Sequence, residues 1–292
     1  MKIGVSSYSF NQLISSGAQS QKSVVKTAKD MGFDGIEFTD LTPPEGLTAE
    51  EYAEEIRSEC EKYSLPVISY TVGADLLKFS GYNNDEEISR VCSKLDIAKI
   101  LGAPTLRHDA AWGIPDTFPP SAGFENVLPL LADSCRKITQ YAKELGIGTM
   151  VENHGFFCQR SERVERLINA VDDANFGALI DIGNFSCADE NNAVAVGNLM
   201  PYAKHIHAKD FHIKSGSEAD PGEGFFRSKA GNYLRGAIIG QGNVPVYQCL
   251  GIIKRSGYDG FLSIEFEGME DCLKGIGIGL ENLRKYLDDL QA

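Results

Sequence analysis

The chain has 292 residues, of which 42% are hydrophobic, enough for one large core or two ordinary ones. It carries 28 basic and 41 acidic residues, a formal net charge of −13, so at long range it repels nucleic acid and anionic membrane surfaces. This balance counts against nucleic-acid and membrane partners and favours a neutral or cationic one.

The cysteines and the N-terminus indicate the compartment. Seven cysteines are spread along the chain without a CxxC pair, which is typical of reduced thiols in a cytosolic protein and argues against a zinc ribbon. The opening residues, MKIGVSSYSF, lack the apolar segment of a signal peptide, and no run approaches the roughly 18 apolar residues of a membrane span. We therefore expect a soluble, cytoplasmic protein.

Short apolar runs alternate with longer amphipathic segments along the whole chain. The short runs predict strands at 3–7, 35–39, 66–72, 104–108, 147–153, 177–182, 203–209 and 260–267. The segments between them predict helices at 22–31, 49–63, 85–101, 124–145, 161–173, 189–199, 245–256 and 270–290. The second helix opens with a capping box, 48-TAEE-51.

Eight predicted strand–helix units over 292 residues are typical of an α/β fold built as a parallel (β/α)₈ barrel. A doubly wound sheet would usually carry a glycine-rich phosphate turn after its first strand, but the turn here reads SYSFNQLISSG. No linker or low-complexity run divides the chain, so residues 1–292 are expected to form a single barrel domain.

Residues 209–243 form the longest segment that we expect to be irregular. Loops of this length in a compact domain are often functional. The segment contains four aromatic residues that suit an apolar cover over a sugar: Phe211, Phe225, Phe226 and Tyr233. We expect it to close the barrel mouth as a lid, or to form a wall supplied by a partner subunit in a homo-oligomer.

Acidic residues and a histidine follow the last four predicted strands. These strands end in Glu152, 181-DIGN-184, 205-HIHAKD-210 and 263-SIEFEG-268. A barrel of this kind carries its chemistry at the C-terminal ends of its strands, so Glu152, Asp181, His207 and Glu265 should converge. Clustered carboxylates need a cation, because removing each from water costs several kcal/mol. Oxygen ligands with one imidazole and no thiolate favour one Mn²⁺ ion, with Mg²⁺, Co²⁺ or Zn²⁺ as alternatives.

The order of these motifs, with the final strand 260-GFLSIEFEG-268, resembles the xylose isomerase-like TIM barrels known as sugar phosphate isomerases/epimerases, which include ketose 3-epimerases and inosose dehydratases. The resemblance covers essentially the whole chain. It implies that Glu152, Asp181, His207 and Glu265 hold one metal ion, and that Glu152 and Glu265 act as general base and general acid. His205 shares a face with His207 and is the alternative ligand, although the HxKD motif favours His207.

Two positions depart from the family pattern. Many members have a histidine where this chain has Asn184, and ketose epimerases often carry a further glutamate shortly after the position of Glu152, where His154 stands here. The related endonuclease IV-type enzymes need several more histidines to hold three zinc ions. The five histidines of this chain therefore disfavour a trinuclear site.

We expect substrate contacts from six residues: His154, His108, Asn184, Lys209, Trp112 and Arg227. For His154 and His108 the alternative is a structural histidine with satisfied hydrogen bonds. Trp112, the only tryptophan, could pack in the core or form a platform for a sugar face. Lys209 could pair with Asp210 or stabilise a developing oxyanion.

The charge near the last strand bears on the substrate. The segment 265-EFEGMED-271 holds four acidic residues where such barrels often bind phosphate, which disfavours a phosphorylated substrate there. Arg227, Lys229 and Arg235 could still supply a phosphate site from the long segment. A free or oxidised sugar, or a cyclitol, is favoured.

These residues predict a divalent-metal-dependent sugar isomerase or epimerase that acts on a ketose or keto-sugar through an enediolate. The alternative is a dehydratase or lyase that acts on an inosose or a 3-keto-glycoside. In that case the enediolate loses a leaving group from the β-carbon of the substrate. An abasic-site endonuclease shares the fold but conflicts with the acidic charge. A non-catalytic sugar-binding protein would not need the four ligands.

Overall fold

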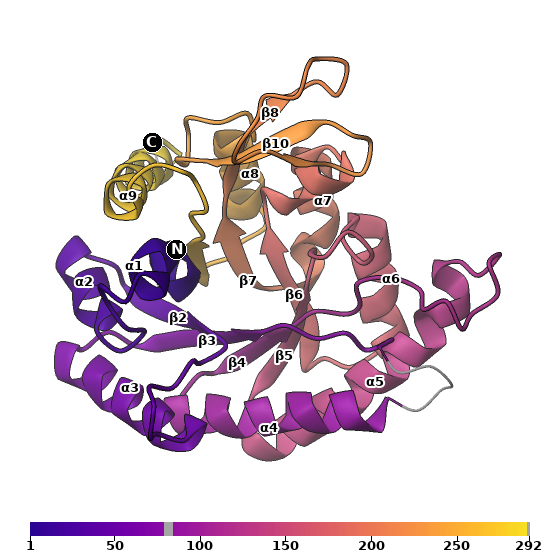
Figure 1. Cartoon of the computed structure of the whole chain (residues 1–292), viewed down its shortest axis with the longest axis horizontal. Coiled ribbons are helices and arrows are strands. Elements are labelled where there is room, and N and C mark those ends of the chain that lie inside the picture. Colours follow the sequence, from indigo (N-terminus) through magenta and orange to yellow (C-terminus); the bar gives the residue numbers. More distant parts are fainter. Residues whose placement is uncertain (79–83, 291–292) are drawn as a thin grey trace.

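The computed structural model describes residues 1–78 and 84–290 and shows a closed parallel barrel surrounded by helices (Figure 1). Around the barrel the strand order is β1-β11-β7-β6-β5-β4-β3-β2. The strands are β1 Lys2–Ser6, β2 Gly35–Thr39, β3 Val67–Val72, β4 Thr105–His108, β5 Gly148–Glu152, β6 Phe176–Asp181, β7 Ala203–Ala208 and β11 Phe261–Ile264. The predicted single (β/α)₈ TIM barrel is confirmed, and each predicted strand takes part in it.

Helices cover the outside of the barrel (Figure 1). The longer ones are α2 Val24–Met31, α3 Ala49–Tyr63, α4 Asp85–Leu101, α5 Phe124–Leu145, α6 Ser161–Val171, α7 Asn192–Leu199, α8 Val246–Arg255 and α9 Cys272–Asp289. The short ones are η1 Ser7–Phe10, α1 Asn11–Ser15, η2 Asn184–Ala188 and η3 Met200–Tyr202. The ends of the predicted helices differ from the observed ends by no more than three residues.

The start of α3 shows how the local sequence sets an element boundary. The hydroxyl of Thr48 accepts a hydrogen bond from the Glu51 N–H at 3.2 Å, and the Glu51 carboxylate accepts one from the Thr48 N–H at 2.9 Å. This is the predicted capping box. It satisfies backbone donors that the helix itself leaves free.

Alternation along the strands separates an inner polar layer from an outer apolar one. On β7, Ile206 and Ala208 are fully buried in the hydrophobic core, whereas His205 and His207 point into the barrel. Ser263 from β11 and Glu37 from β2 meet these histidines inside the barrel. The site end of the barrel is therefore polar, and the main apolar core lies between strands and helices.

Residues 209–243 were predicted to be irregular. This prediction is wrong in part, because the segment contains a second, antiparallel sheet. Its strands are β8 Asp210–Lys214, β9 Phe226–Arg227 and β10 Tyr233–Ala237, in the order β8-β10-β9. In Figure 1 the sheet projects at the top, beside α7 and α8. The Asp210 carboxylate ties its two ends together by accepting hydrogen bonds from the backbone N–H groups of Gly240, Gly242 and Val244 at 2.9–3.0 Å.

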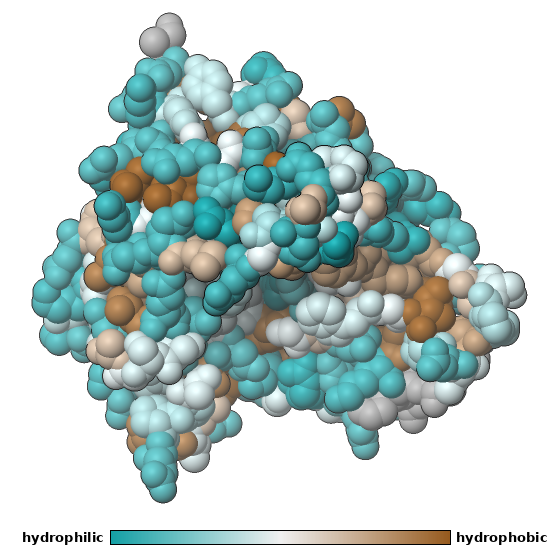
Figure 2. Space-filling view, turned by 45° about the horizontal axis from the view of Figure 1, so that its top comes forward, coloured by the Kyte–Doolittle hydropathy of each residue, from teal (hydrophilic) through white to brown (hydrophobic). Residues whose placement is uncertain are grey.

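One face of the molecule is mainly polar (Figure 2). The face in Figure 2 is largely hydrophilic, with small hydrophobic groups scattered over it. Within residues 1–78 and 84–290, no helix combines the length and the apolar content that crossing a membrane requires.

Candidate active site

The structure brings together the four residues that the strand ends predict. Glu152 and Asp181 are the last residues of β5 and β6, His207 precedes the last residue of β7, and Glu265 directly follows β11. One potential ligand atom from each lies within 4.8 Å of those of the others. The cluster is almost completely enclosed, since Glu152, Asp181 and His207 are buried and Glu265 is partly buried. It therefore has the composition and compactness of a metal site.

Among the described residues, Nδ1 of His207 and Oδ2 of Asp181 have no hydrogen bond, although Glu265 lies 3.6 Å from that nitrogen and Nζ of Lys209 lies 3.2 Å from that oxygen. The other side of each group is occupied: Nε2 of His207 lies 2.8 Å from Glu37, and Oδ1 of Asp181 accepts the N–H groups of Gly183 and Asn184 at 2.8 and 2.9 Å. Buried polar atoms are rarely left unpaired, and metal-binding side chains are usually oriented in this way by a second partner. These residues fit a divalent cation bound through nitrogen and oxygen.

The charge balance also fits a cation. Two permanent positive charges, Arg107 and Lys209, face a larger set of buried carboxylates: Glu37, Asp109, Glu152, Asp181 and Glu265. Burial raises the pKa of Asp181 to about 6; the attraction of Lys209 opposes this rise, and repulsion from Glu265 and Glu152 adds to it. A divalent cation would relieve this repulsion.

Lys209 is an internal counter-ion of the cluster. Its Nζ lies 2.5 Å from Glu265 and 3.2 Å from Asp181. Burial alone would lower the pKa of Lys209, but Asp181 and Glu265 raise it well above the usual value, so the ammonium stays charged. The alternative ion pair with Asp210 is not formed, because the Asp210 carboxylate faces backbone N–H groups at the base of the second sheet.

Arg107 is a functional candidate that the sequence analysis did not single out. Its Nη2 lies 2.5 Å from Glu152 and 3.0 Å from Asp109, and Asp109 in turn lies 3.0 Å from Nδ1 of His154. These contacts join Glu152 to His154 through Arg107 and Asp109. The available signal was an arginine inside the short apolar strand 104–108, where a buried cation needs carboxylate partners.

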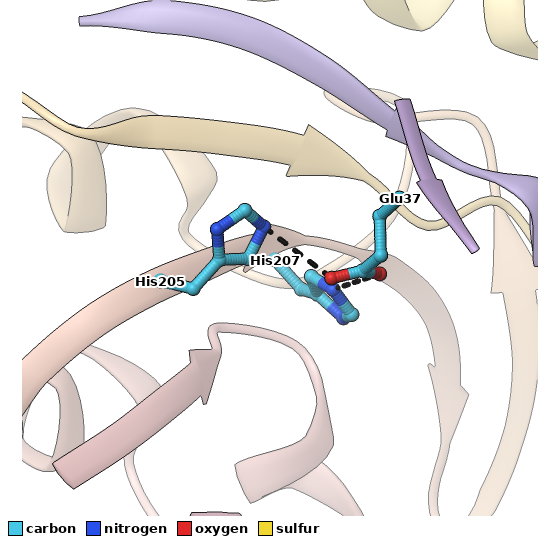
Figure 3. Close-up of side chains that lie close together, drawn as sticks. All are labelled: Glu37, His205 and His207. Atoms are coloured by element: carbon cyan, nitrogen blue, oxygen red, sulfur yellow. Dashed lines mark hydrogen bonds and ion pairs between the residues drawn. The ribbon is translucent and has the colours of Figure 1, made fainter. Parts of the chain in front are cut away.

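Glu37, His205 and His207 form a second buried group inside the barrel (Figure 3). Nε2 of His205 lies 2.8 Å from the Ser263 hydroxyl and 3.5 Å from Glu37. Burial is the largest cause that lowers the pKa of His205, to about 4, so it is neutral near pH 7. His205 thus supports the residues behind the cluster, and Glu37 orients His207.

A cavity of about 350 Å³ opens onto the cluster. It is lined by Tyr8, Thr39, Asp40, Thr71, Gly73, Arg107, Glu152, His154, Lys209, Glu265 and Glu267. The lining is polar and rich in carboxylates, and both of its permanent cations are already paired with carboxylates. Such a cavity suits a neutral molecule with many hydroxyl groups better than an anion.

The family model of the xylose isomerase-like TIM barrel matches residues 25–286, most of the chain. The chain belongs to this family. An inosose dehydratase of Clostridium perfringens is 24% identical over 144 residues, which is 47% of this chain and 46% of that protein. The chain thus spans about half the length of the inosose dehydratases that it matches.

Two solved structures of this kind share the fold. A 3-keto-D-glucoside 4-epimerase from E. coli has a TM-score of 0.69 and 19% identity, with 98% of this chain and 99% of that chain covered. A xylose isomerase-like TIM barrel protein from Mycobacterium smegmatis, in complex with magnesium, has a TM-score of 0.65 and 18% identity, with 92% and 87% covered. Sequence identities this low support a common fold and leave the substrate open.

Asn184, which stands where many members of the family have histidine, lies between two members of the cluster. Its Nδ2 donates to Glu152 at 2.9 Å, and its Oδ1 accepts from Lys209 at 3.2 Å. Asn184 is buried and is not part of the cavity lining. It orients the side chains of Glu152 and Lys209.

The other expected substrate contacts are divided. His154 lines the cavity, and Trp112 lies beside it, 55% exposed, with the ring centroids 5.5 Å apart. His108 is fully buried and stacks on Phe176, because it points to the opposite face of β4 from Arg107. Arg227 lies on the second sheet over the ring of Tyr233. Neither His108 nor Arg227 lines the cavity.

The aromatic residues expected to cover the barrel mouth have other partners. Phe211 is fully buried and contacts the edge of Phe226, with the ring centroids 5.7 Å apart, and Tyr233 is buried as well. In the described part of the chain neither these residues nor Phe225 lines the cavity. They form the packing of the second sheet, so the apolar cover predicted from the sequence is not formed by them.

Proposed function

We propose that this protein is a divalent-metal-dependent enzyme that moves a proton at the carbon beside a carbonyl group, and so isomerises or epimerises a neutral ketose or keto-sugar. The observation that carries the proposal is the convergence of four potential ligand atoms within 4.8 Å, two of them, on Asp181 and His207, buried without a hydrogen bond and set between two glutamates that line a polar cavity. The family includes proteins named as sugar epimerases, which supports the same class of reaction.

The proposed metal ligands are Glu152, Asp181, His207 and Glu265, with Mn²⁺ as the expected ion and Mg²⁺, Co²⁺ or Zn²⁺ as alternatives. A relative with the same fold binds magnesium. When bound, a divalent cation would supply Lewis acidity that stabilises negative charge on the oxygens of an α-hydroxy-ketone. The remaining chemistry falls to the side chains around the cavity.

Glu152 and Glu265 are proposed to exchange the proton, one as base and the other as acid. Burial alone would raise the pKa of Glu265, but Lys209 and His207 hold it well below its usual range, so this carboxylate is ionised and able to accept a proton. Glu152 is oriented by Arg107 and Asn184. Lys209, beside Glu265, is placed to donate a hydrogen bond to an oxygen that gains negative charge.

A dehydratase is the second candidate, and His154 is the observation that favours it. Burial would lower the pKa of His154, but its hydrogen bond to Asp109 raises the pKa above the usual value. A protonated His154 could give its proton to a leaving hydroxyl group, which departs as water while a glutamate takes the α-proton and a carbon–carbon double bond forms. The inosose dehydratases that match about half of the chain support this alternative.

The test is a screen of neutral ketoses, inososes and 3-keto-glycosides with the metal-loaded protein in deuterated water, followed by NMR. Deuterium at the α-carbon with an epimer or isomer as product would support the first proposal, and deuterium with loss of water would support the second. Glu152→Gln serves as the inactive control. Full conversion without any solvent label would contradict proton exchange through a carboxylic acid.

A further inference from the structure

A second hollow, of about 390 Å³, lies between the start of α5, the start of α6 and the turn that connects β9 to β10. It shares no lining residue with the cavity that opens onto the cluster of proposed metal ligands. Its lining is Phe124, Glu125, Arg160, Glu162, Arg163, Arg166 and Lys229. Basic residues therefore outnumber acidic ones here, the reverse of the chain as a whole.

Three of these cations lack a counter-ion. Both carboxylates of the lining pair with Arg166, whose guanidinium lies 2.5 Å from Glu125 and 3.5 Å from Glu162. Among residues 1–78 and 84–290, no carboxylate forms an ion pair with the remaining three cations, which we call the α6 anion site: Arg160, Arg163 and Lys229. Burial lowers the pKa of Lys229, and repulsion from Arg163 and Arg160 lowers it further. In a chain of net charge −13, such crowding of positive charge indicates a place for an anion.

The side chain of Arg163 and the backbone of Lys229 are held in position by other contacts. The Arg163 guanidinium lies 5.1 and 5.2 Å from the rings of Phe124 and Phe157 and donates to the Phe157 carbonyl at 2.7 Å. The N–H of Lys229 donates to the Cys187 carbonyl at 2.9 Å. A side chain fixed like that of Arg163 loses little further freedom when it binds a ligand.

We propose that the α6 anion site binds a phosphate group, either as inorganic phosphate or as part of a small phosphorylated metabolite. Two guanidinium groups and an ammonium group supply several charge-assisted donors, which suits a tetrahedral dianion. The hollow is larger than a phosphate ion, and the ring of Phe124 gives it one apolar wall for an organic group.

The site also connects two parts of the chain that are far apart in the sequence. Lys229 belongs to the turn of the second sheet, whereas Arg160 and Arg163 belong to the start of α6. Arg163 also contacts Phe157, in the segment that connects His154 to α6. A phosphate bound by all three cations would hold the second sheet against this segment, so we expect phosphate to restrict the motion of the residues that follow His154.

The binding test is isothermal titration calorimetry of the metal-loaded, full-length protein with sodium phosphate, at constant ionic strength set with sodium chloride. Glycerol phosphate is the organic probe, and glycerol is its uncharged control. We expect one phosphate per chain, and reduced hydrogen exchange in segments 153–160 and 226–232 when it is bound. Tighter binding of glycerol phosphate than of phosphate identifies a phosphorylated metabolite as the ligand, and equal binding identifies phosphate itself.

The variant for this test is Arg160→Gln with Lys229→Gln, which removes two exposed cations and leaves the packed Arg163 in place. We expect its affinity for phosphate to fall by about tenfold or more. The matched control, Lys26→Gln with Arg57→Gln, removes two charges from surface ion pairs on α2 and α3 and should bind as the wild type does. No binding by the wild type, or equal binding by the Arg160/Lys229 variant, would overturn the proposal.

Discussion

Glu152 and His154 lie two residues apart, but their contacts predict different defects when they are replaced. Glu152→Gln removes a charged member of the cluster and a proposed proton carrier, so it should abolish turnover and weaken metal binding. His154→Ala leaves the four proposed ligands in place and should lower kcat by about 10²- to 10⁴-fold. Metal content by mass spectrometry and steady-state kinetics would measure both effects. Loss of metal in His154→Ala would contradict this division of roles.

Metal binding should strengthen as the pH rises from about 5 to about 8. Burial raises the pKa of Asp181 to about 6; burial would lower the pKa of His207, but Glu37 and Glu265 raise it well above its usual value. A proton on either side chain competes with the cation, and this competition disappears as the proton dissociates. Titration with Mn²⁺ at several pH values should show a falling dissociation constant. A constant or rising value would argue against these ligands.

At the level of single residues, the sequence allows prediction of the site residues that stand at the ends of apolar strands. Asp181 and Glu265 stand at such positions, and the barrel brings them together as expected. Arg107 and Glu37 lie within strands, and their partners come from other strands of the closed barrel. Their contacts depend on strand register and on closure of the barrel, which a single sequence does not specify.

Among the structural elements, the second sheet depends on one carboxylate. Asp210 accepts backbone N–H groups from Gly240, Gly242 and Val244, so Asp210→Ala would leave three donors, one of them the buried N–H of Val244, without this partner. We expect a loss of about 2 kcal/mol or more in the free energy of unfolding, and faster hydrogen exchange in residues 210–244. Chemical denaturation would measure the loss.

Asp220→Ala is the control for this variant, because Asp220 is an exposed carboxylate in the same segment whose hydrogen bond is to the N–H of Gly222. It should change stability by less than about 0.5 kcal/mol. Equal effects of the two substitutions would show that the Asp210 contacts do not hold the sheet together.

The second sheet is the element that the sequence analysis did not predict. The connection between β8 and β10 is long and rich in glycine and acidic residues, which indicates a loop. The pairing of these strands is non-local and requires Asp210 to reach the backbone beyond β10. By contrast, the barrel strands and helices follow a period that is visible within each segment, so their bounds could be predicted closely.

For the whole molecule, we expect metal binding to increase the free energy of unfolding. An ion that binds only the folded state at about 100 times its dissociation constant adds about 2.7 kcal/mol. For a chain of this length we expect Tm to rise by roughly 5–10 °C when Mn²⁺ is added to the metal-free protein. Differential scanning calorimetry would record the shift.

Asp181→Asn provides the comparison for this experiment. It removes a crowded carboxylate and keeps an oxygen to accept the N–H groups of Gly183 and Asn184, so its metal-free form should remain folded. We expect Mn²⁺ to raise its Tm much less than that of the wild type. An equal rise in both proteins would place the metal elsewhere.

The position of Trp112 gives the protein an intrinsic fluorophore beside His154, a residue that lines the cavity. It is the only tryptophan in the chain, and its exposed ring makes an edge contact with the His154 ring. A protonated imidazole quenches indole emission, so fluorescence should brighten as the pH rises through the raised pKa of His154. His154→Gln should abolish this titration. The same emission can be followed while candidate sugars are added, so ligands can be found without any assay of turnover.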